Sequence, residues 1–318
     1  MKRQFVKDLK PGTIVNDVFW CARRDLKDRR DGSQFLTFEI RDRTGSLPAI
    51  MWDKIEDGLN YIADGNFCHV QGRVGDYQGK LQITVNAVYP VEPVQVSRAD
   101  FLPASRFNSA ELMKELQEYI SSIKNPYLRS LLESFFRDTD FAARFAQAPA
   151  AVRVHHAWLG GLLEHTVMMC RQANHLPEVY PEIDRDLLLT GCILHDIGKL
   201  QEYTISTAIE HTDEGKLLGH IVLGYQMVAD HIRQIPDFPP ELAKMVLHII
   251  LAHHGEHEYG APKTPKFPEA FLVFALDYQD SRLAIFRSAM EKNRGLRWTE
   301  FNDYLETEVY LNDVQDNE

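Results

Sequence analysis

The chain of 318 residues is 44% hydrophobic and 25% charged, with a formal net charge of −11. This length and composition can bury the cores of two ordinary domains, which excludes a disordered or fibrous protein. Charged residues near the start stand where a signal peptide needs an apolar core, and no apolar run approaches the roughly 18 residues of a membrane span. We therefore expect a cytoplasmic protein that has no membrane partner.

The segment from about residue 13 to residue 91 alternates apolar and polar side chains. Leu36, Phe38 and Ile40 alternate with residues of an opposite, more polar face, and the stretch from Cys68 to Val74 does the same. A period of two residues predicts half-buried strands. The first part of the chain therefore reads as an all-β domain.

Turn signals divide this segment into five strands. They are Asp31-Gly32, Thr44-Gly45 and Gln78-Gly79, and a short helix is expected from Asp53 to Tyr61. Five strands with a helix between the third and fourth follow the order of an OB-fold, a small barrel that binds oligonucleotides. The segment resembles the nucleic-acid-binding OB domains in this order, and we expect residues 1–95 to form such a domain.

The polar face of the barrel carries candidate residues for binding nucleic acid. Aromatic rings stack on unpaired bases, and arginines follow the phosphate backbone of a single strand. The candidates are Phe35, Arg41, Trp52, His69, Arg73 and Tyr77. For each aromatic residue, the alternative is packing within the barrel or between domains.

The remainder of the chain reads as a helical domain. Prolines and the lack of a period predict a linker over residues 96–108, and Asn108 with Glu111 predicts a helix cap. From residue 109 to residue 311 apolar residues recur at helical spacing, so we expect helix after helix. Residues 312–318 read as an acidic tail in solvent.

Seven residues of the helical part have the chemistry of metal ligands. His195 and Asp196 lie in Cys-Ile-Leu-His-Asp-Ile-Gly-Lys, an apolar stretch whose helix is expected to end near Gly198. Burying such a pair is costly unless both groups have partners, and a metal ion supplies one. A single buried histidine is more often a hydrogen-bonded core residue, but several in informative motifs favour a metal centre. The set is His165, His195, Asp196, His220, His253, His254 and Asp277.

The order of these motifs resembles the HD superfamily of metal-dependent phosphohydrolases. The resemblance implies that one ion is held by His165, His195, Asp196 and Asp277. His220 and His253 match positions that hold a second ion in the two-metal branch, with Asp196 bridging the ions. The sequence does not choose between His253 and His254.

An OB-fold followed by an HD domain is similar to the YhaM-type 3′-to-5′ exoribonucleases over nearly the whole chain. Matching stretches are Gly-Gly-Leu-Leu-Glu-His-Thr, Leu-Leu-Gly-His-Ile and Tyr-Gly-Ala-Pro-Lys-Thr-Pro. The resemblance implies stepwise hydrolysis of single-stranded RNA from its 3′ end to nucleoside 5′-monophosphates, with single-stranded DNA as an alternative substrate. Whether the chain forms a homo-oligomer stays open.

The charge distribution departs from what a nucleic-acid partner suggests. Of the 35 Lys and Arg and the 46 Asp and Glu, 14 and 13 fall in residues 1–95, which leaves 21 and 33 for the remainder. A protein that binds duplexes nonspecifically is usually basic. The acidic C-terminal part therefore puts substrate affinity in question more than chemistry.

The ligand set suggests how the reaction proceeds. Two ions about 3.5–4 Å apart hold and activate a water molecule that attacks a phosphodiester. Imidazoles with a shared carboxylate suit Mn²⁺, Fe²⁺ or Co²⁺ better than Mg²⁺, and we favour Mn²⁺. Beside Asp196, a catalytic role falls to Lys199, which could neutralise a phosphate oxygen; the alternative is a solvated lysine at a helix end. Glu164 either orients a ligand or lies on a helix surface.

Two other functions fit parts of this pattern. An HD hydrolase of cyclic dinucleotides should carry Gly-Tyr-Pro after His253-His254, where this chain has Gly-Glu-His-Glu-Tyr-Gly-Ala-Pro. A hydrolase of small nucleotides has less use for an OB-fold. A non-catalytic regulator that binds single strands has no need for the intact ligand set. We therefore favour the exonuclease.

Overall fold

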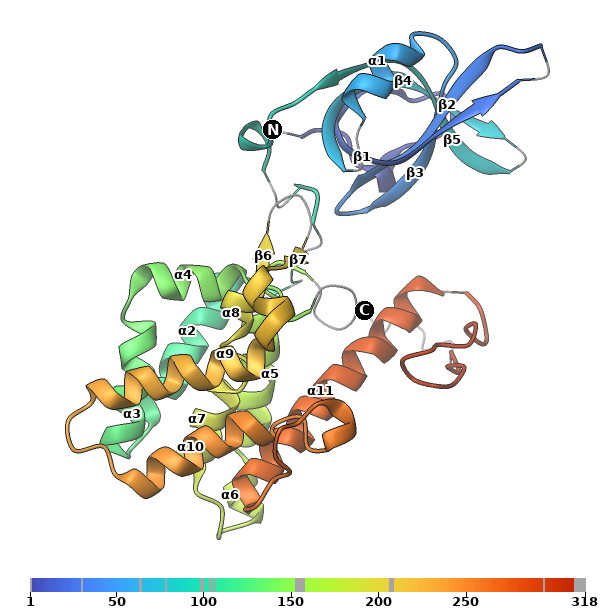
Figure 1. The fold of residues 1–318 in the computed structure, drawn as a ribbon. Coiled ribbons are helices and arrows are strands. Elements are labelled where there is room, and N and C mark those ends of the chain that lie inside the picture. The colour runs from blue at the N-terminus through green and yellow to red at the C-terminus, as the bar shows by residue number, and fades with distance from the viewer. Residues whose placement is uncertain are drawn as a thin grey trace. The chain divides into compact units, whose positions relative to one another are not determined.

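The computed structural model divides into two compact units, one formed by residues 1–104 and the other by residues 105–205 and 209–318 (Figure 1). The structure describes residues 2–29, 31–62, 65–77, 79–97, 100–102, 105, 107–151, 158–205, 209–293 and 295–311. The predicted tail at 312–318, Gln78 of one predicted turn and part of the predicted linker lie outside the described residues. Among the described helices, none has the length and apolar character needed to cross a bilayer.

The first unit is the predicted five-stranded barrel. Its strands close in the order β1-β2-β3-β5-β4; β3 and β5 pair in parallel and all other neighbours pair antiparallel. The predicted helix α1 lies between β3 and β4. The bounds are β1 Ile14–Asp28, β2 Gln34–Asp42, β3 Gly45–Met51, α1 Ile55–Tyr61, β4 Asn66–Tyr77 and β5 Lys80–Pro90, with 3₁₀ turns at Val6–Asp8 and Pro93–Gln95.

The alternation of β2 is confirmed, whereas that of β4 breaks at its start. Leu36, Phe38 and Ile40 of β2 are buried in the barrel. On β4, both Phe67 and Cys68 are buried, although neighbouring residues of a strand point to opposite faces. The side chain of Phe67 lies on the outer face of the barrel. It is nevertheless buried because its ring packs edge-to-face on that of Phe101, with the ring centroids 4.7 Å apart. The chain that follows β5 therefore contributes to this unit.

The second unit is helical, as predicted. Its helices are α2 Ser109–Ser122, α3 Pro126–Phe136, α4 Thr139–Gln147, α5 Gly161–Ala173, α6 Leu176–Val179, α7 Arg185–Leu194, α8 Lys199–Glu202, α9 Asp213–Gln234, α10 Pro240–Ala252 and α11 Pro268–Lys292. The cap predicted at Asn108 is confirmed, since its side chain accepts hydrogen bonds from the backbone N–H groups of Ala110 and Glu111. The core contains Leu116, Leu132, Phe145, Leu163, Leu188 and Ile249.

Two segments correct the expectation of helix after helix. A two-stranded antiparallel sheet of β6 Tyr203–Ile205 and β7 Ile209–His211 stands between α8 and α9, because tyrosine and β-branched residues favour strand pairing there. Residues 295–311 form no helix and are held by the isolated bridges Trp298–Tyr310 and Asn302–Thr307. The residues that we expected to be helical up to 311 therefore include an irregular segment after α11.

The helix that leads to His195-Asp196 also ends earlier than predicted. It ends at Leu194 rather than near Gly198, and residues 195–198 continue as turns. The close approach of α9 explains the turn, because a Cβ on Gly198 would lie 2.0 Å from the carbonyl oxygen of His220. Only glycine lets the two backbones meet at this point.

Candidate metal centre

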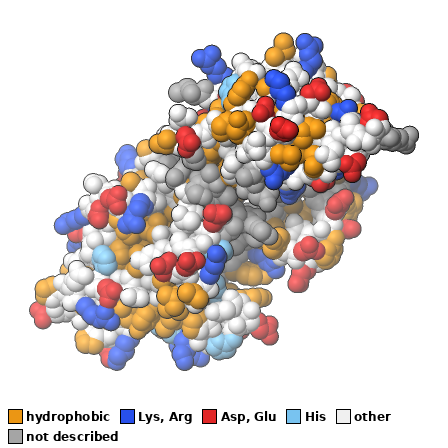
Figure 2. All heavy atoms as spheres, turned by 45° about the horizontal axis from the view of Figure 1, so that its top comes forward, with side chains coloured by type: hydrophobic (Ala, Val, Ile, Leu, Met, Phe, Trp, Pro, Cys, Tyr) orange, Lys and Arg blue, Asp and Glu red, His pale blue; other side chains and the backbone are white. Residues whose placement is uncertain are grey.

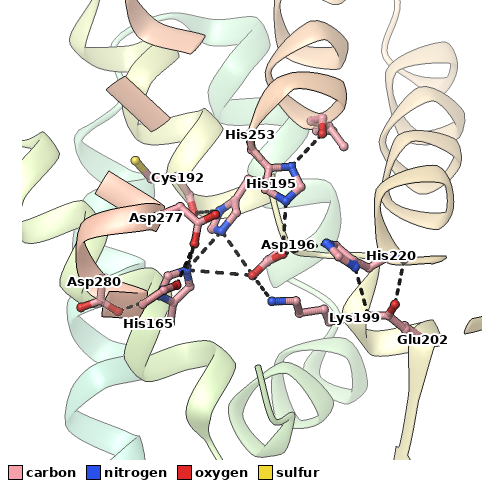
Figure 3. A network of polar contacts seen from close by, with 12 residues as sticks. His165, Cys192, His195, Asp196, Lys199, Glu202, His220, His253, Asp277 and Asp280 are labelled. Carbon is pink, nitrogen blue, oxygen red and sulfur yellow. Dashed lines mark hydrogen bonds and ion pairs between the residues drawn. The ribbon is translucent and has the colours of Figure 1, made fainter. Parts of the chain in front are cut away.

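The seven predicted ligand residues come from five places in the helical unit, and Figure 3 labels all of them except His254. His165 lies on α5, His195 and Asp196 follow α7, and His220 lies on α9. His253 and His254 follow α10, and Asp277 lies on α11. Because α5, α7, α10 and α11 pack against one another, these residues converge. The structure thus brings the whole set together.

The first group of donor atoms surrounds Nε2 of His165. This atom lies 3.3 Å from Nε2 of His195 and 3.3 Å from Oδ1 of Asp277. Oδ2 of Asp196 lies 3.3 Å from the same nitrogen of His195 and 3.9 Å from that of His165. Nitrogen and oxygen donors from four residues are therefore within reach of one ion.

The second group surrounds the other carboxylate oxygen of Asp196. Oδ1 lies 3.5 Å from Nε2 of His220 and 3.6 Å from Nε2 of His253. All three atoms are buried and have no hydrogen-bond partner among the described residues. Leaving buried polar atoms without partners is costly, and a cation between them would satisfy all three. Asp196 thus offers one oxygen to each group, as a bridging ligand does.

The two adjacent histidines have different surroundings, although the ligand atoms of both lie with that of His220 in one group within 4.8 Å. His253 is fully buried and faces Asp196, as described above. His254 contacts the carbonyl oxygen of Tyr259 through Nδ1 at 2.9 Å. The ring centroid of His254 nevertheless lies 5.2 Å from that of His220. His253 therefore has the closer relation to the bridging carboxylate, and His254 stands at the rim.

An outer contact fixes the orientation of each inner imidazole. Nδ1 of His195 lies 2.9 Å from the carbonyl oxygen of Cys192, and Nδ1 of His253 lies 2.7 Å from that of Ile250. Since a carbonyl only accepts, both Nδ1 atoms donate, and the Nε2 lone pairs are left for the centre. The contacts of the other two imidazoles are to carboxylates.

Asp280 and Glu202 supply these carboxylate contacts, and the sequence did not single them out. Asp280 Oδ2 lies 2.7 Å from Nδ1 of His165, and Glu202 Oε2 lies 3.1 Å from Nδ1 of His220. Asp280 follows Asp277 by three residues on α11, so both share a helix face. Glu202 follows Lys199 by three residues on α8. This spacing is a local signal, but by itself it does not show which imidazole each carboxylate approaches.

The electrostatics of the centre favour charged carboxylates. Burial opposes the ionisation of Asp196, but the Lys199 ammonium and His195 outweigh it and hold its pKa well below the usual range. Burial also opposes ionisation of Asp277, whose pKa is lowered by its hydrogen bond to His165. Burial lowers the pKa of His253, which keeps its imidazole neutral. Anionic carboxylates and a neutral imidazole are what a divalent cation requires.

Lys199 and Glu164 are both buried, which rules out the solvent-exposed alternative for each. The Lys199 ammonium lies 2.5 Å from Oδ2 of Asp196. The Glu164 carboxylate accepts a hydrogen bond from the indole N–H of Trp158 at 2.9 Å. Lys199 therefore stands within the centre, and Glu164 anchors the chain just before α5.

The predicted nucleic-acid-binding residues of the barrel do not form one cluster. Phe35 packs on Trp52 with ring centroids 4.8 Å apart, and the Arg29 guanidinium lies 4.3 Å from the Trp52 ring. Arg73 and Tyr77 lie exposed on β4, a strand that does not pair with the β2 strand of Phe35.

The remaining two predicted residues of the barrel have polar or aromatic neighbours. Arg41 pairs with Glu39 at 2.6 Å, and the His69 ring lies 6.4 Å from that of Tyr89. The role of all six residues in binding nucleic acid stays a prediction.

The surface charges are mixed. On the face drawn in Figure 2, basic and acidic side chains are interspersed and do not gather into a single basic patch. This arrangement agrees with the near balance of charge in residues 1–95.

Comparison with known proteins relates both units to characterised families. The HD domain model matches residues 162–281, and that of the OB-fold nucleic acid binding domain matches residues 20–91. The 3′-5′ exoribonuclease YhaM of Shouchella clausii is 33% identical over 90% of this chain and 89% of its own length. The Bacillus subtilis protein of that name is 33% identical over 85% of each chain. The Listeria monocytogenes protein is 29% identical over 96% of this chain and 97% of its own.

Proposed function

The chain belongs to the YhaM family of 3′-5′ exoribonucleases, and from this membership we propose that it shortens single-stranded RNA from the 3′ end. Single-stranded DNA is a second substrate for the same chemistry. The barrel unit suits an unpaired strand, since exposed rings and arginines contact bases and phosphates without reading their sequence. A duplexed end has to be unpaired before it enters.

One observation carries the mechanism that we propose. Oδ1 of Asp196 and the Nε2 atoms of His220 and His253 are buried, face one another and have no hydrogen-bond partner among the described residues. Together with the group around His165, they would hold two divalent cations, and Asp196 has one oxygen in each group. Imidazole and carboxylate donors suit Mn²⁺, which we favour, or Fe²⁺ or Co²⁺.

Different residues of the chain have different roles in the reaction. When bound, a pair of such ions lowers the pKa of a water molecule and stabilises charge on the reacting phosphate. Asp280 and Glu202 orient two of the imidazoles, and Lys199 neutralises a non-bridging phosphate oxygen. Because water is the nucleophile, we expect nucleoside 5′-monophosphates as products, with no requirement for inorganic phosphate.

Metal analysis and digestion of end-labelled RNA test this proposal together. We expect two ions per chain, and 5′-labelled single-stranded RNA should shorten stepwise with Mn²⁺ and stall near a stable hairpin. RNA labelled at the 3′ end should release its label early. Cleavage of a circular single-stranded RNA would contradict an exonuclease, because that substrate has no end to enter.

Substitution of the bridging carboxylate provides the matched comparison. Asp196→Asn should abolish both bound metal and turnover, because it removes the shared negative charge. Asp230→Asn changes an exposed carboxylate of α9 and should leave both unchanged. If Asp196→Asn kept most of its turnover, the two-metal assignment would be wrong.

A further inference from the structure

A cleft of about 520 Å³ opens beside the metal centre in the helical unit. Lys199, His254 and Asp277 line it on the side of the centre. Its wall continues along α11 from Asp277 through Tyr278 and Arg282, residues that a helix places on neighbouring turns. The volume falls in the range of small-ligand pockets, roughly 300–1,000 Å³. A single nucleotide is therefore the scale of ligand to consider.

Two tyrosines form an aromatic wall in this cleft. The rings of Tyr259 and Tyr278 have an interplanar angle of 25° and centroids 6.4 Å apart. Both stay exposed, at 56% and 42%, so solvent and ligands can reach them. Exposed aromatic rings that line a pocket are suited to stacking on a base of any identity.

The backbone and a guanidinium hold this wall in place. A Cβ on Gly255 would lie 2.4 Å from the Phe274 ring, so only glycine lets the loop that carries Tyr259 lie against α11. The Arg282 Nε donates a hydrogen bond to the Tyr278 hydroxyl at 3.1 Å, and another of its N–H groups donates to the carbonyl oxygen of Tyr304. Tyr278 is thus fixed before any ligand binds.

The cleft has carboxylates where the segment after α11 reaches it. Asp303 and Glu306, which precede and follow Tyr304 in the sequence, line the cleft. The carbonyl oxygen of Tyr304 accepts a hydrogen bond from Arg282. Arg282 follows Asp277 by five residues, or about 7.5 Å along a helix. A phosphate group at these carboxylates is repelled, whereas ribose hydroxyls can donate hydrogen bonds to them. The chemistry of the cleft therefore changes along its length.

We infer that this cleft is a slot for the 3′-terminal nucleoside of the strand. Tyr259 and Tyr278 stack on the terminal base, Asp303 and Glu306 accept the free ribose hydroxyls, and the preceding phosphate lies toward Lys199. A strand that ends in a 3′-phosphate is disfavoured because it places negative charge against both carboxylates. This inference rests on the proposed exonuclease function and deepens it.

Matched RNA ends test the acidic part of the slot. With Mn²⁺, the wild-type chain should release the first nucleotide from a 3′-hydroxyl strand at least about tenfold faster than from the same strand with a 3′-phosphate, on the scale of a repelled charge near a protein surface. The double variant Asp303→Asn/Glu306→Gln should lose most of this discrimination. Glu308→Gln, an exposed residue of the same segment that does not line the cleft, should retain it.

A strand whose terminal nucleotide lacks its base tests the aromatic wall. The wild-type chain should remove this abasic nucleotide about tenfold more slowly than a normal one, in line with the loss of one stacked base. Tyr278→Ala should process both ends at the same reduced rate. Tyr278→Phe keeps the ring but loses the hydroxyl bonded to Arg282, so it should retain most of the difference between the two ends. Equal rates for the two ends in the wild type would overturn the role of the wall.

A small chromogenic phosphodiester separates failure of this inference from failure of the proposed function. If the wild type cleaves neither this diester nor RNA with Mn²⁺, the proposed function is wrong. If it cleaves both but treats 3′-hydroxyl and 3′-phosphate ends alike, only the nucleoside slot is wrong. Activity of each variant on the chromogenic diester also shows that it is folded.

Discussion

Nδ1 of His165 lies 2.7 Å from the Asp280 carboxylate, while Nε2 of the same ring faces Asp277, which stands one turn earlier on α11. One helix thus contacts both nitrogens of one imidazole. The ring cannot rotate away without losing two charged contacts. Asp280 therefore acts on the metal centre through His165.

Replacement of Asp280 by Asn should weaken metal binding without removing a donor atom. The amide keeps the size of the carboxylate but loses its charge, so the imidazole becomes a poorer donor. We expect Mn²⁺ affinity to fall roughly 10–100-fold, as measured by calorimetric titration of the metal-free protein. Glu291→Gln, an exposed substitution on the same helix, is the control. Unchanged affinity in Asp280→Asn would show that the contact is only structural.

Metal-induced stabilisation should grow with pH. Burial lowers the pKa of His165, but its hydrogen bonds to Asp277 and Asp280 outweigh burial and raise it to about 10. In the metal-free protein, the protonated ring contributes stability fully below about pH 6.5, and this contribution is lost as the pH rises through its raised pKa. A metal ion needs the neutral ring and competes with that proton.

The measurement is the difference in melting temperature with Mn²⁺ and with chelator. This difference should increase from about pH 6.5 to about pH 9, as the proton on His165 becomes easier to displace. His165→Gln should remove most of this pH dependence. A difference that stays constant or falls over this range in the wild type would contradict the competition.

Gly198→Ala should disturb the second group of donor atoms. The added Cβ would collide with the backbone of His220, which cannot move aside as a side-chain end could. We expect a loss of stability of about 1–3 kcal/mol, typical of overpacking, together with a lower content of bound metal. Chemical denaturation and metal analysis measure the two effects. Gly75→Ala, where the nearest atom to a new Cβ is 4.0 Å away, should change neither.

Two exposed residues of β4 provide a test of the barrel unit. Arg73 and Tyr77 are four residues apart on one strand and therefore share a face. Their joint replacement by Ala should weaken binding of a long single strand by roughly 1–3 kcal/mol, the scale of one stacked base, and spare a chromogenic phosphodiester. Fluorescence anisotropy and turnover measure the two effects. Arg137→Ala, exposed on the helical unit, is the control.

The sequence predicts most of the fold because the spacing of apolar residues is regular wherever a strand or helix buries one face. The alternation of β2 and the cap at Asn108 depend on neighbouring residues alone, and both are confirmed. Phe67 departs from its pattern because Phe101, distant in sequence, covers it. The irregular segment after α11 is held by the bridges Trp298–Tyr310 and Asn302–Thr307, which join residues that a helical period does not pair.

The candidate site also has residues that the sequence predicts and residues that it does not. Histidines are scarce enough for their motifs to be informative, and the structure brings all those of the predicted set together with Asp196 and Asp277. Asp280 and Glu202 could not be chosen from many helix carboxylates, because their role depends on which imidazole approaches them. The aromatic wall of Tyr259 and Tyr278 likewise arises only when the loop after α10 lies against α11.

Residues 1–95 hold 14 Lys and Arg against 13 Asp and Glu, and the two kinds of side chain are interspersed on the face drawn in Figure 2, which bears on how binding should respond to ionic strength. Each phosphate neutralised by a basic side chain releases condensed counterions, and on single strands the affinity falls with salt by a logarithmic slope of about 0.7 per contact. Cations scattered among acidic groups neutralise few phosphates at once. The affinity for a strand should then depend only weakly on salt concentration and come mainly from contacts with aromatic rings. The availability of unpaired bases, more than charge, therefore determines which RNA ends are bound.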